Sequence, residues 1–162
     1  VNQSHSGVEV ESKVALHEMV DVDFVVSFGD WYFDGDAKGD YTEMEYNDDN
    51  QVIGQTSTEY QYALSNLKVG DMPQTSYVGG LTLKPIEGLR VQGLYKWYDN
   101  HYADWSPDSR EVDGDDVDRA QVWKVPSYSI FDLHFAYAVP TEIAAVTLFA
   151  HVFNLLNELF NA

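Results

Sequence analysis

The sequence predicts an all-β protein, an antiparallel up-and-down meander of about six strands. In successive segments, apolar and polar residues alternate with a period of two, as in strands whose two faces meet different surroundings. The connections between these segments are alternately short and long along the chain, and the long ones are acidic. A membrane barrel explains this second pattern, because its two rims face different compartments.

The first two strands are expected at residues 7–16 and 20–29, joined by a tight turn at residues 17–19. Two alternating segments this close in sequence predict a β-hairpin. The chain from residue 30 to about residue 76 is a long polar excursion. Its first part, residues 30–50, is acidic and contains glycine, which predicts an exposed loop, with a strand extension around residues 59–63.

The third and fourth strands are expected at residues 77–84 and 89–98, on either side of a Lys-Pro-Ile-Glu-Gly turn. A second acidic loop should occupy residues 99–122. The fifth and sixth strands then follow at residues 123–137 and 144–153, with a short connection between them. These lengths suit a tilted membrane strand, which needs about 9–11 residues.

The alternation divides the strand residues into two faces. Apolar residues expected to face lipid are Val22, Phe24, Val26, Val91 and Trp97. Residues expected to face a wet lumen are Asp21, Asp23, Arg90, Gln92 and Lys96. A hydrophobic core would not accept the second set unpaired. A soluble sheet with one solvated side also alternates in this way, so the pattern leaves both readings open.

Bulk composition excludes several function classes. The 162 residues predict one domain, and 27 acidic against 9 basic residues give a net charge of -18, which argues against a nucleic-acid partner. The chain has no cysteine, so it has neither disulfides nor thiolate metal sites. No segment approaches the roughly 20 apolar residues of a membrane helix. The aromatic content of 14% fits either an interface girdle or ordinary cross-strand pairs.

Sequence motifs for catalysis and metal binding are weak. Asp34 and Asp36 imitate the start of a calcium loop, but Lys38 stands where an oxygen ligand is needed. The acidic cluster at Asp113, Asp115, Asp116 and Asp118 has no ligand spacing. We therefore expect solvated acidic loops and no metal site. Without a nucleophile motif or phosphate loop, we expect neither enzymatic activity nor a cofactor.

The five histidines include no pair spaced four residues apart. His134 and His151 fall in the middle of expected strands, where we expect them to face the lumen with a hydrogen-bond partner.

The aromatic stretch at residues 97–105 is the best candidate for ligand contact. Flat rings and amide groups together suit a sugar or a chelate at the mouth of a barrel. The candidate residues are Tyr98, Asn100, His101, Tyr102 and Trp105. The alternative is a structural role, in which these rings form an interface girdle and the loop packs on itself.

Four segments resemble TonB-dependent outer-membrane receptors. Residues 2–11, NQSHSGVEVE, resemble an Asn-x4-Gly-Val-Glu-x-Glu strand of that family, and residues 67–75, LKVGDMPQT, are similar to the entry into its next strand. Residues 118–128 followed by 132–134 resemble a further segment. Residues 152–157, VFNLLN, are similar to a motif on its penultimate barrel strand.

This resemblance implies that residues 1–162 form part of a 22-stranded outer-membrane barrel, near its C-terminal end. It implies a bacterial receptor that takes up a ferric chelate, cobalamin or a glycan, with outer-membrane lipid around it. Energy would come through the TonB complex. The plug domain, the segment that engages TonB, and the final strand would be missing from this chain.

The alternative function is that of a soluble extracellular carbohydrate-binding module. Its two sheets would pack face to face, and its acidic loops could hold calcium.

Overall fold

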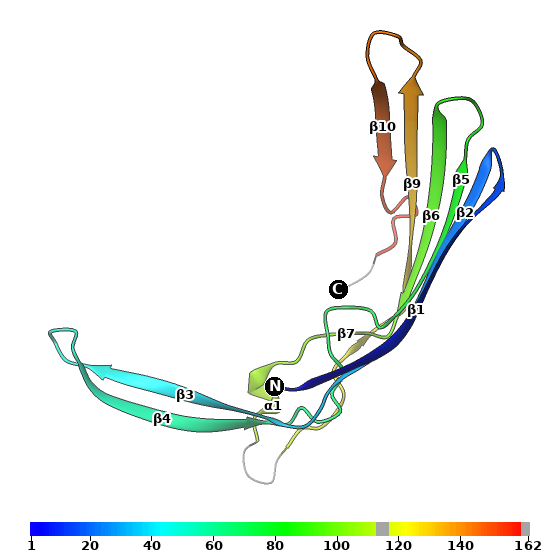
Figure 1. Cartoon of the computed structure of the whole chain (residues 1–162). Coiled ribbons are helices and arrows are strands. Elements are labelled where there is room, and N and C mark those ends of the chain that lie inside the picture. The colour runs from blue at the N-terminus through cyan, green and yellow to red at the C-terminus, as the bar shows by residue number, and fades with distance from the viewer. Residues whose placement is uncertain (113–116, 160–162) are drawn as a thin grey trace. The chain divides into compact units, whose positions relative to one another are not determined.

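The computed structural model describes residues 1–112 and 117–159, and its regular structure is almost entirely β-strand. Six strands form one antiparallel sheet and follow one another across it in chain order, as Figure 1 shows. They are β1 (Gln3–His17), β2 (Val20–Phe33), β5 (Thr75–Leu83), β6 (Leu89–Asp99), β9 (Tyr128–Val139) and β10 (Val146–Val152). The predicted all-β fold with a six-stranded antiparallel meander is therefore confirmed.

Short connections join β1 to β2, β5 to β6 and β9 to β10, whereas long ones join β2 to β5 and β6 to β9. In an antiparallel meander, this order places all short connections at one end of the sheet. The turn between β5 and β6 ends at Gly88, whose φ of +80° favours glycine. A Cβ there would also lie 2.5 Å from the carbonyl oxygen of Ala138. Both constraints explain a glycine at this position.

The prediction of an exposed loop at residues 30–50 is wrong, because much of this segment forms a strand. β3 (Ala37–Tyr46) pairs with β4 (Val52–Tyr62) in an exposed antiparallel hairpin, visible in Figure 1. Its turn is closed by Asn47, whose side-chain oxygen accepts hydrogen bonds from the backbone N–H groups of Asp49 and Gln51. Since most residues on both faces of the hairpin are exposed, its sequence lacks the apolar alternation that marks a half-buried strand.

The fifth predicted strand is also broken. Lys124–Val125 forms a separate short strand, β8, and β9 begins only at Tyr128. Pro126, between them, has no N–H to donate to a strand ladder. The second acidic excursion also contains the two-residue strand β7 (His101–Tyr102) and a single helical turn, α1 (Pro107–Arg110).

The contacts of the chain divide it into two compact units. The sheet unit comprises Ser6–Asp30, Asp71–His101 and the described part of Lys124–Ala162. The loop unit comprises Val1–His5, Trp31–Gly70 and the described part of Tyr102–Trp123. β1 and β2 contribute residues to both.

The loop unit has its own small hydrophobic core of Phe33, Ala37, Leu64 and Leu67, with Leu64 fully buried. The two polar excursions meet around this core. Ala63 donates a backbone hydrogen bond to the carbonyl oxygen of Arg110 at 2.8 Å, and Val112 donates one to Gln61 at 2.8 Å. The excursions therefore form one packed structure in place of two independent loops.

In the sheet unit, strand register sorts the side chains into two faces. One row of directly paired residues crosses five strands and is polar throughout: Asp21, Thr82, Gln92, His134 and His151. The adjacent row, on the opposite face, is Val22, Leu81, Gly93, Leu133 and Val152. We call these the polar face and the apolar face. Successive residues point to opposite faces, so the sorting continues along the strands, although Val25, Val78, Leu94 and Ile130 also lie on the polar face.

The apolar face is exposed. Phe24 is 42% exposed, Leu81 46% and Tyr95 47%, although all three lie within strands of the sheet. Soluble monomers rarely leave so continuous an apolar surface uncovered. The outer strands β1 and β10 also each have only one neighbour within the described part of the sheet.

We expect the 162-residue chain to self-associate in aqueous buffer, because the apolar face and two strand edges are available for association. Sedimentation velocity should show large species without detergent and a single protein–detergent species with it. Phe24→Asn with Leu81→Asn should reduce association in buffer, whereas Ser27→Asn on the polar face should not. A monodisperse wild-type monomer in plain buffer would contradict this expectation.

Candidate functional site

The polar face is the candidate functional site, because it carries most of the charged residues of β2, β6 and β9. Strand register places all five predicted lumen residues on it: Asp21, Asp23, Arg90, Gln92 and Lys96. Lys84 forms an ion pair with Asp21 at 2.7 Å, which joins the end of β5 to β2. Gln92 reaches Asp23 only at the limit of hydrogen bonding, 3.5 Å. Whether this face lines a lumen stays a prediction.

Asp132 is the most deeply buried charge in the described part of the chain, with 2% of its surface exposed. Lys96 pairs with one of its carboxylate oxygens at 2.7 Å. The other oxygen accepts a hydrogen bond from the backbone N–H of Asn154 at 2.8 Å. A buried carboxylate needs such partners, because desolvation without them is costly. Asp132 thus ties β6, β9 and the segment after β10 together.

Sequence reasoning missed this role of Asp132. Its only signal is a carboxylate in an otherwise apolar stretch, at the strand position that shares a face with His134. The partner Asn154 has a left-handed φ of 49°, and its side chain exchanges two hydrogen bonds with the backbone of Glu158. That local turn positions the Asn154 N–H toward β9.

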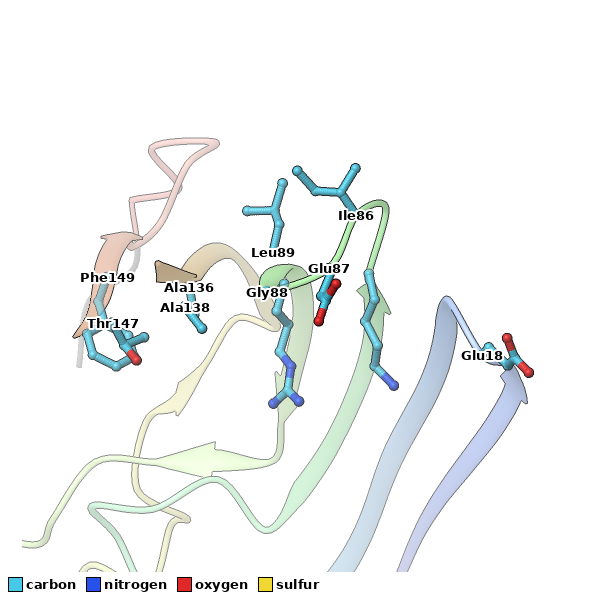
Figure 2. Close-up of a pocket in the computed structure, with 11 residues that line it drawn as sticks. Glu18, Ile86, Glu87, Gly88, Leu89, Ala136, Ala138, Thr147 and Phe149 are labelled. Carbon is cyan, nitrogen blue, oxygen red and sulfur yellow. The ribbon is translucent and has the colours of Figure 1, made fainter. Parts of the chain in front are cut away.

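A cavity of about 590 Å³ lies at the short-turn end of the sheet unit, and Figure 2 shows its lining. Glu18 comes from the β1–β2 turn and Glu87 from the β5–β6 turn. Phe149 and Thr147 contribute from β10. Lys84 and Arg90 also line it, so charges of both signs surround an open space. The arrangement of these charged side chains does not indicate a particular ligand.

The predicted ligand-contact residues are divided between the two units. In the sheet unit, Asn100 has a left-handed φ of 52° and links neighbouring segments: it donates to Thr75 at 2.9 Å and accepts from Lys124 at 2.8 Å. Tyr98 and buried His101 both lie beside the ring of Tyr128. The side chain of Asn100 is therefore engaged within the protein, whereas the buried Nδ1 of His101 has no hydrogen-bond partner among the described residues.

Tyr102 and Trp105 belong to the loop unit. Trp105 packs against the small core there, with its ring 6.2 Å from that of Phe33 and 5.7 Å from that of Tyr62, between centroids. This geometry assigns Trp105 a packing role. Contact with a ligand stays a prediction for the five residues.

The acidic sequence around Asp36 forms an ion pair. Arg119 donates to both carboxylate oxygens of Asp36, at 3.0 and 2.7 Å, and Ser65 donates its backbone N–H at 3.0 Å. These bonds, with that from Arg119 the strongest, lower the pKa of Asp36 to about 2. The carboxylate is therefore occupied by protein donors, as a calcium ligand would not be.

Among residues 1–112 and 117–159, no group of three or more His, Asp or Glu side chains could hold a metal ion. The predicted acidic cluster at Asp113, Asp115 and Asp116 lies outside these residues. Its fourth member, Asp118, is described and pairs with Arg110 at 3.6 Å.

Within the described residues, the helical content includes no segment with the length and hydropathy needed to cross a bilayer. Comparison of the chain with protein-family models, with curated proteins and with solved structures gave no match.

Lys96→Met should lower the free energy of unfolding by about 3 kcal/mol, because it leaves buried Asp132 with only the Asn154 N–H as a partner. The matched control is Lys38→Met on the exposed hairpin, where the pair with Glu59 has side chains 60% and 53% exposed. That change should alter stability by less than about 1 kcal/mol. Urea unfolding in detergent measures both, and equal losses would contradict a special role for Asp132.

Asp36→Asn should destabilise the loop unit by about 1 kcal/mol near neutral pH, a modest value because the ion pair is partly exposed. The pKa of Asp36 falls from 3.8 to about 2 on folding. The ionised carboxylate therefore stabilises the folded state fully at pH values well above 3.8. This stabilisation is lost as the pH decreases through 3.8 toward 2. Urea titrations followed by tryptophan fluorescence at several pH values should show the two proteins converging in acid. A constant difference down to pH 2 would exclude this ion pair as the cause.

Proposed function

We propose that this chain forms part of the wall of an outer-membrane receptor of the TonB-dependent kind, which takes up a scarce nutrient. The observation that carries the proposal is the two-faced sheet, with a continuous apolar face that is exposed and a polar face that holds paired charges. Four sequence segments that resemble this family, in the expected order, support the same conclusion.

Membrane physics gives each face a role. In a bilayer, backbone groups must be satisfied by neighbouring strands, so a membrane β-protein needs a closed sheet. β1 and β10 would then pair with further strands of the same barrel. Val22, Phe24, Val26, Val91 and Trp97 would contact lipid. The strands β5, β6 and β9, with 9, 11 and 12 residues, have about the length that a tilted crossing requires.

The polar face would line the lumen. Asp21, Asp23, Arg90, Gln92 and Lys96 would face it, and the ion pairs Lys84–Asp21 and Lys96–Asp132 would compensate the two buried carboxylates. The long connections between β2 and β5 and between β6 and β9 would leave from the outer rim of such a barrel.

The ligand would be a ferric chelate, cobalamin or a glycan, and energy would arrive through TonB. In this proposal, parts of the receptor outside these 162 residues perform the coupling to TonB. The chain itself carries out no covalent chemistry.

Site-directed spin labelling tests the membrane assignment directly. The chain has no cysteine, so single-cysteine variants can be labelled without a background. In lipid bilayers, labels at Phe24, Leu81 and Leu133 should be accessible to oxygen, which dissolves in the membrane. Labels at Ser27, Ser76 and Gln92 should be accessible to a water-soluble nickel complex, so the two faces of β2 and of β5 should respond to different reagents.

The competing function, a soluble carbohydrate-binding module, predicts a different result. Its apolar face would be covered by protein, so labels there would be inaccessible to both reagents and the chain would not enter bilayers. Either outcome would falsify the receptor proposal.

A further inference from the structure

Two histidines 17 positions apart meet on the polar face. His134 in β9 and His151 in β10 are direct partners in the strand register, and their Nδ1 atoms lie 2.7 Å apart. Two imidazole nitrogens approach this closely in one of two ways. Either one Nδ1–H donates to the other Nδ1, or both nitrogens are deprotonated and share a cation.

The distance between the nitrogens favours a particular coordination geometry. Imidazole nitrogens bind divalent transition metals at roughly 2.0–2.1 Å. Two such bonds at a right angle place the nitrogens ~2.9 Å apart, whereas a tetrahedral angle places them ~3.3 Å apart. The observed 2.7 Å is shorter than both values and is that of a hydrogen bond between the two rings, so the nitrogens must separate to bind either metal. The site therefore needs less movement to accept tetragonal Cu²⁺ than to accept tetrahedral Zn²⁺.

Aromatic rings support both imidazoles. Phe153 lies 5.7 Å from His134 and 6.1 Å from His151, and Phe149 stacks on His151 at 6.4 Å, between ring centroids. Phe149 and Phe153 are themselves 67% and 69% exposed, so these contacts favour the observed histidine rotamers without fixing them. A bidentate pair then binds with less loss of side-chain entropy than two free histidines would.

The remaining coordination positions open toward a cavity. A space of about 290 Å³ is lined by both histidines together with Arg90, Gln92, Ala136 and other residues of these strands. No third His, Asp or Glu of the described residues completes a metal site, so a bound ion would keep positions for water or a small chelator. The Arg90 guanidinium at the edge of the cavity favours a co-ligand with a carboxylate.

We propose that His134 and His151 form a two-imidazole site for Cu²⁺, open to a small carboxylate-bearing co-ligand. Copper binds nitrogen ligands more tightly than the other divalent first-row metals do, which suits a site with only two protein ligands. The net charge of -18 raises the local concentration of cations. This site depends on the β9–β10 register and not on the receptor proposal, so either proposal can fail without the other.

Titration of the detergent-solubilised full chain with Cu²⁺, in a buffer that does not chelate copper, tests the proposal. Continuous-wave EPR should show one axial Cu²⁺ species with nitrogen couplings, at one ion per chain. His134→Gln and His151→Gln should each weaken binding at least about tenfold, because one imidazole is left. His17→Gln is the matched control, since His17 lies at a turn outside the pair, and it should leave binding unchanged.

Pulsed EPR on the wild-type protein gives a readout that does not depend on how the variants fold. It counts the imidazoles bound to the ion, and two are expected. One imidazole, or binding that survives the loss of both histidines, would overturn the proposal. So would the absence of copper binding, which would leave the pair as a hydrogen bond between imidazoles. A further arm adds acetate, a weak monodentate ligand, which should change the copper spectrum of the wild type more than that of Arg90→Gln; equal changes would overturn the role of Arg90 in holding the co-ligand.

Discussion

Strand register is the constraint on which the rest of this structure depends. Because side chains alternate between faces, a slip of one residue in any strand pair would exchange the two faces of that strand. The row from Asp21 through Thr82, Gln92 and His134 to His151 is polar only because four successive pairings agree. The same four pairings align Val22, Leu81, Leu133 and Val152 on the opposite side. Both faces are therefore consequences of one alignment.

Charges on the polar face reinforce this alignment. Lys96 and Asp132 come from neighbouring strands, and a shifted register would leave a buried carboxylate without its cation. The small size of Gly80 also favours this strand register. Gly80 lies directly opposite Asp23, whose carboxylate occupies the space that a Cβ would take. The exposed apolar face provides little packing that could fix the strand register. Ion pairs and the small residue Gly80 on the polar face therefore fix it.

Sequence reasoning predicted the sheet well because alternation is a local signal. Val22, Phe24 and Val26 identify β2 without any knowledge of its neighbours. It did not predict the hairpin of β3 and β4, where Tyr41, Met44 and Tyr46 are exposed and give no alternation to read. The break at Pro126 could have been predicted from the missing N–H. Contacts between distant segments, such as Asp36 with Arg119 or His134 with His151, have no spacing rule and require the register first.

The loop unit has a consequence for the order of folding. The β3–β4 hairpin joins residues close in sequence, whereas its neighbouring core needs Trp105 and Val122 to reach Phe33 and Leu64. The Asp36–Arg119 pair alone closes a span of 83 residues. Closing such a span from an unfolded chain is entropically unfavourable, and contacts between distant residues form slowly. Pairing of β2 with β5 and of β6 with β9 would shorten this span by bringing the ends of each excursion together, so we expect the β3–β4 hairpin to form before the core of the loop unit.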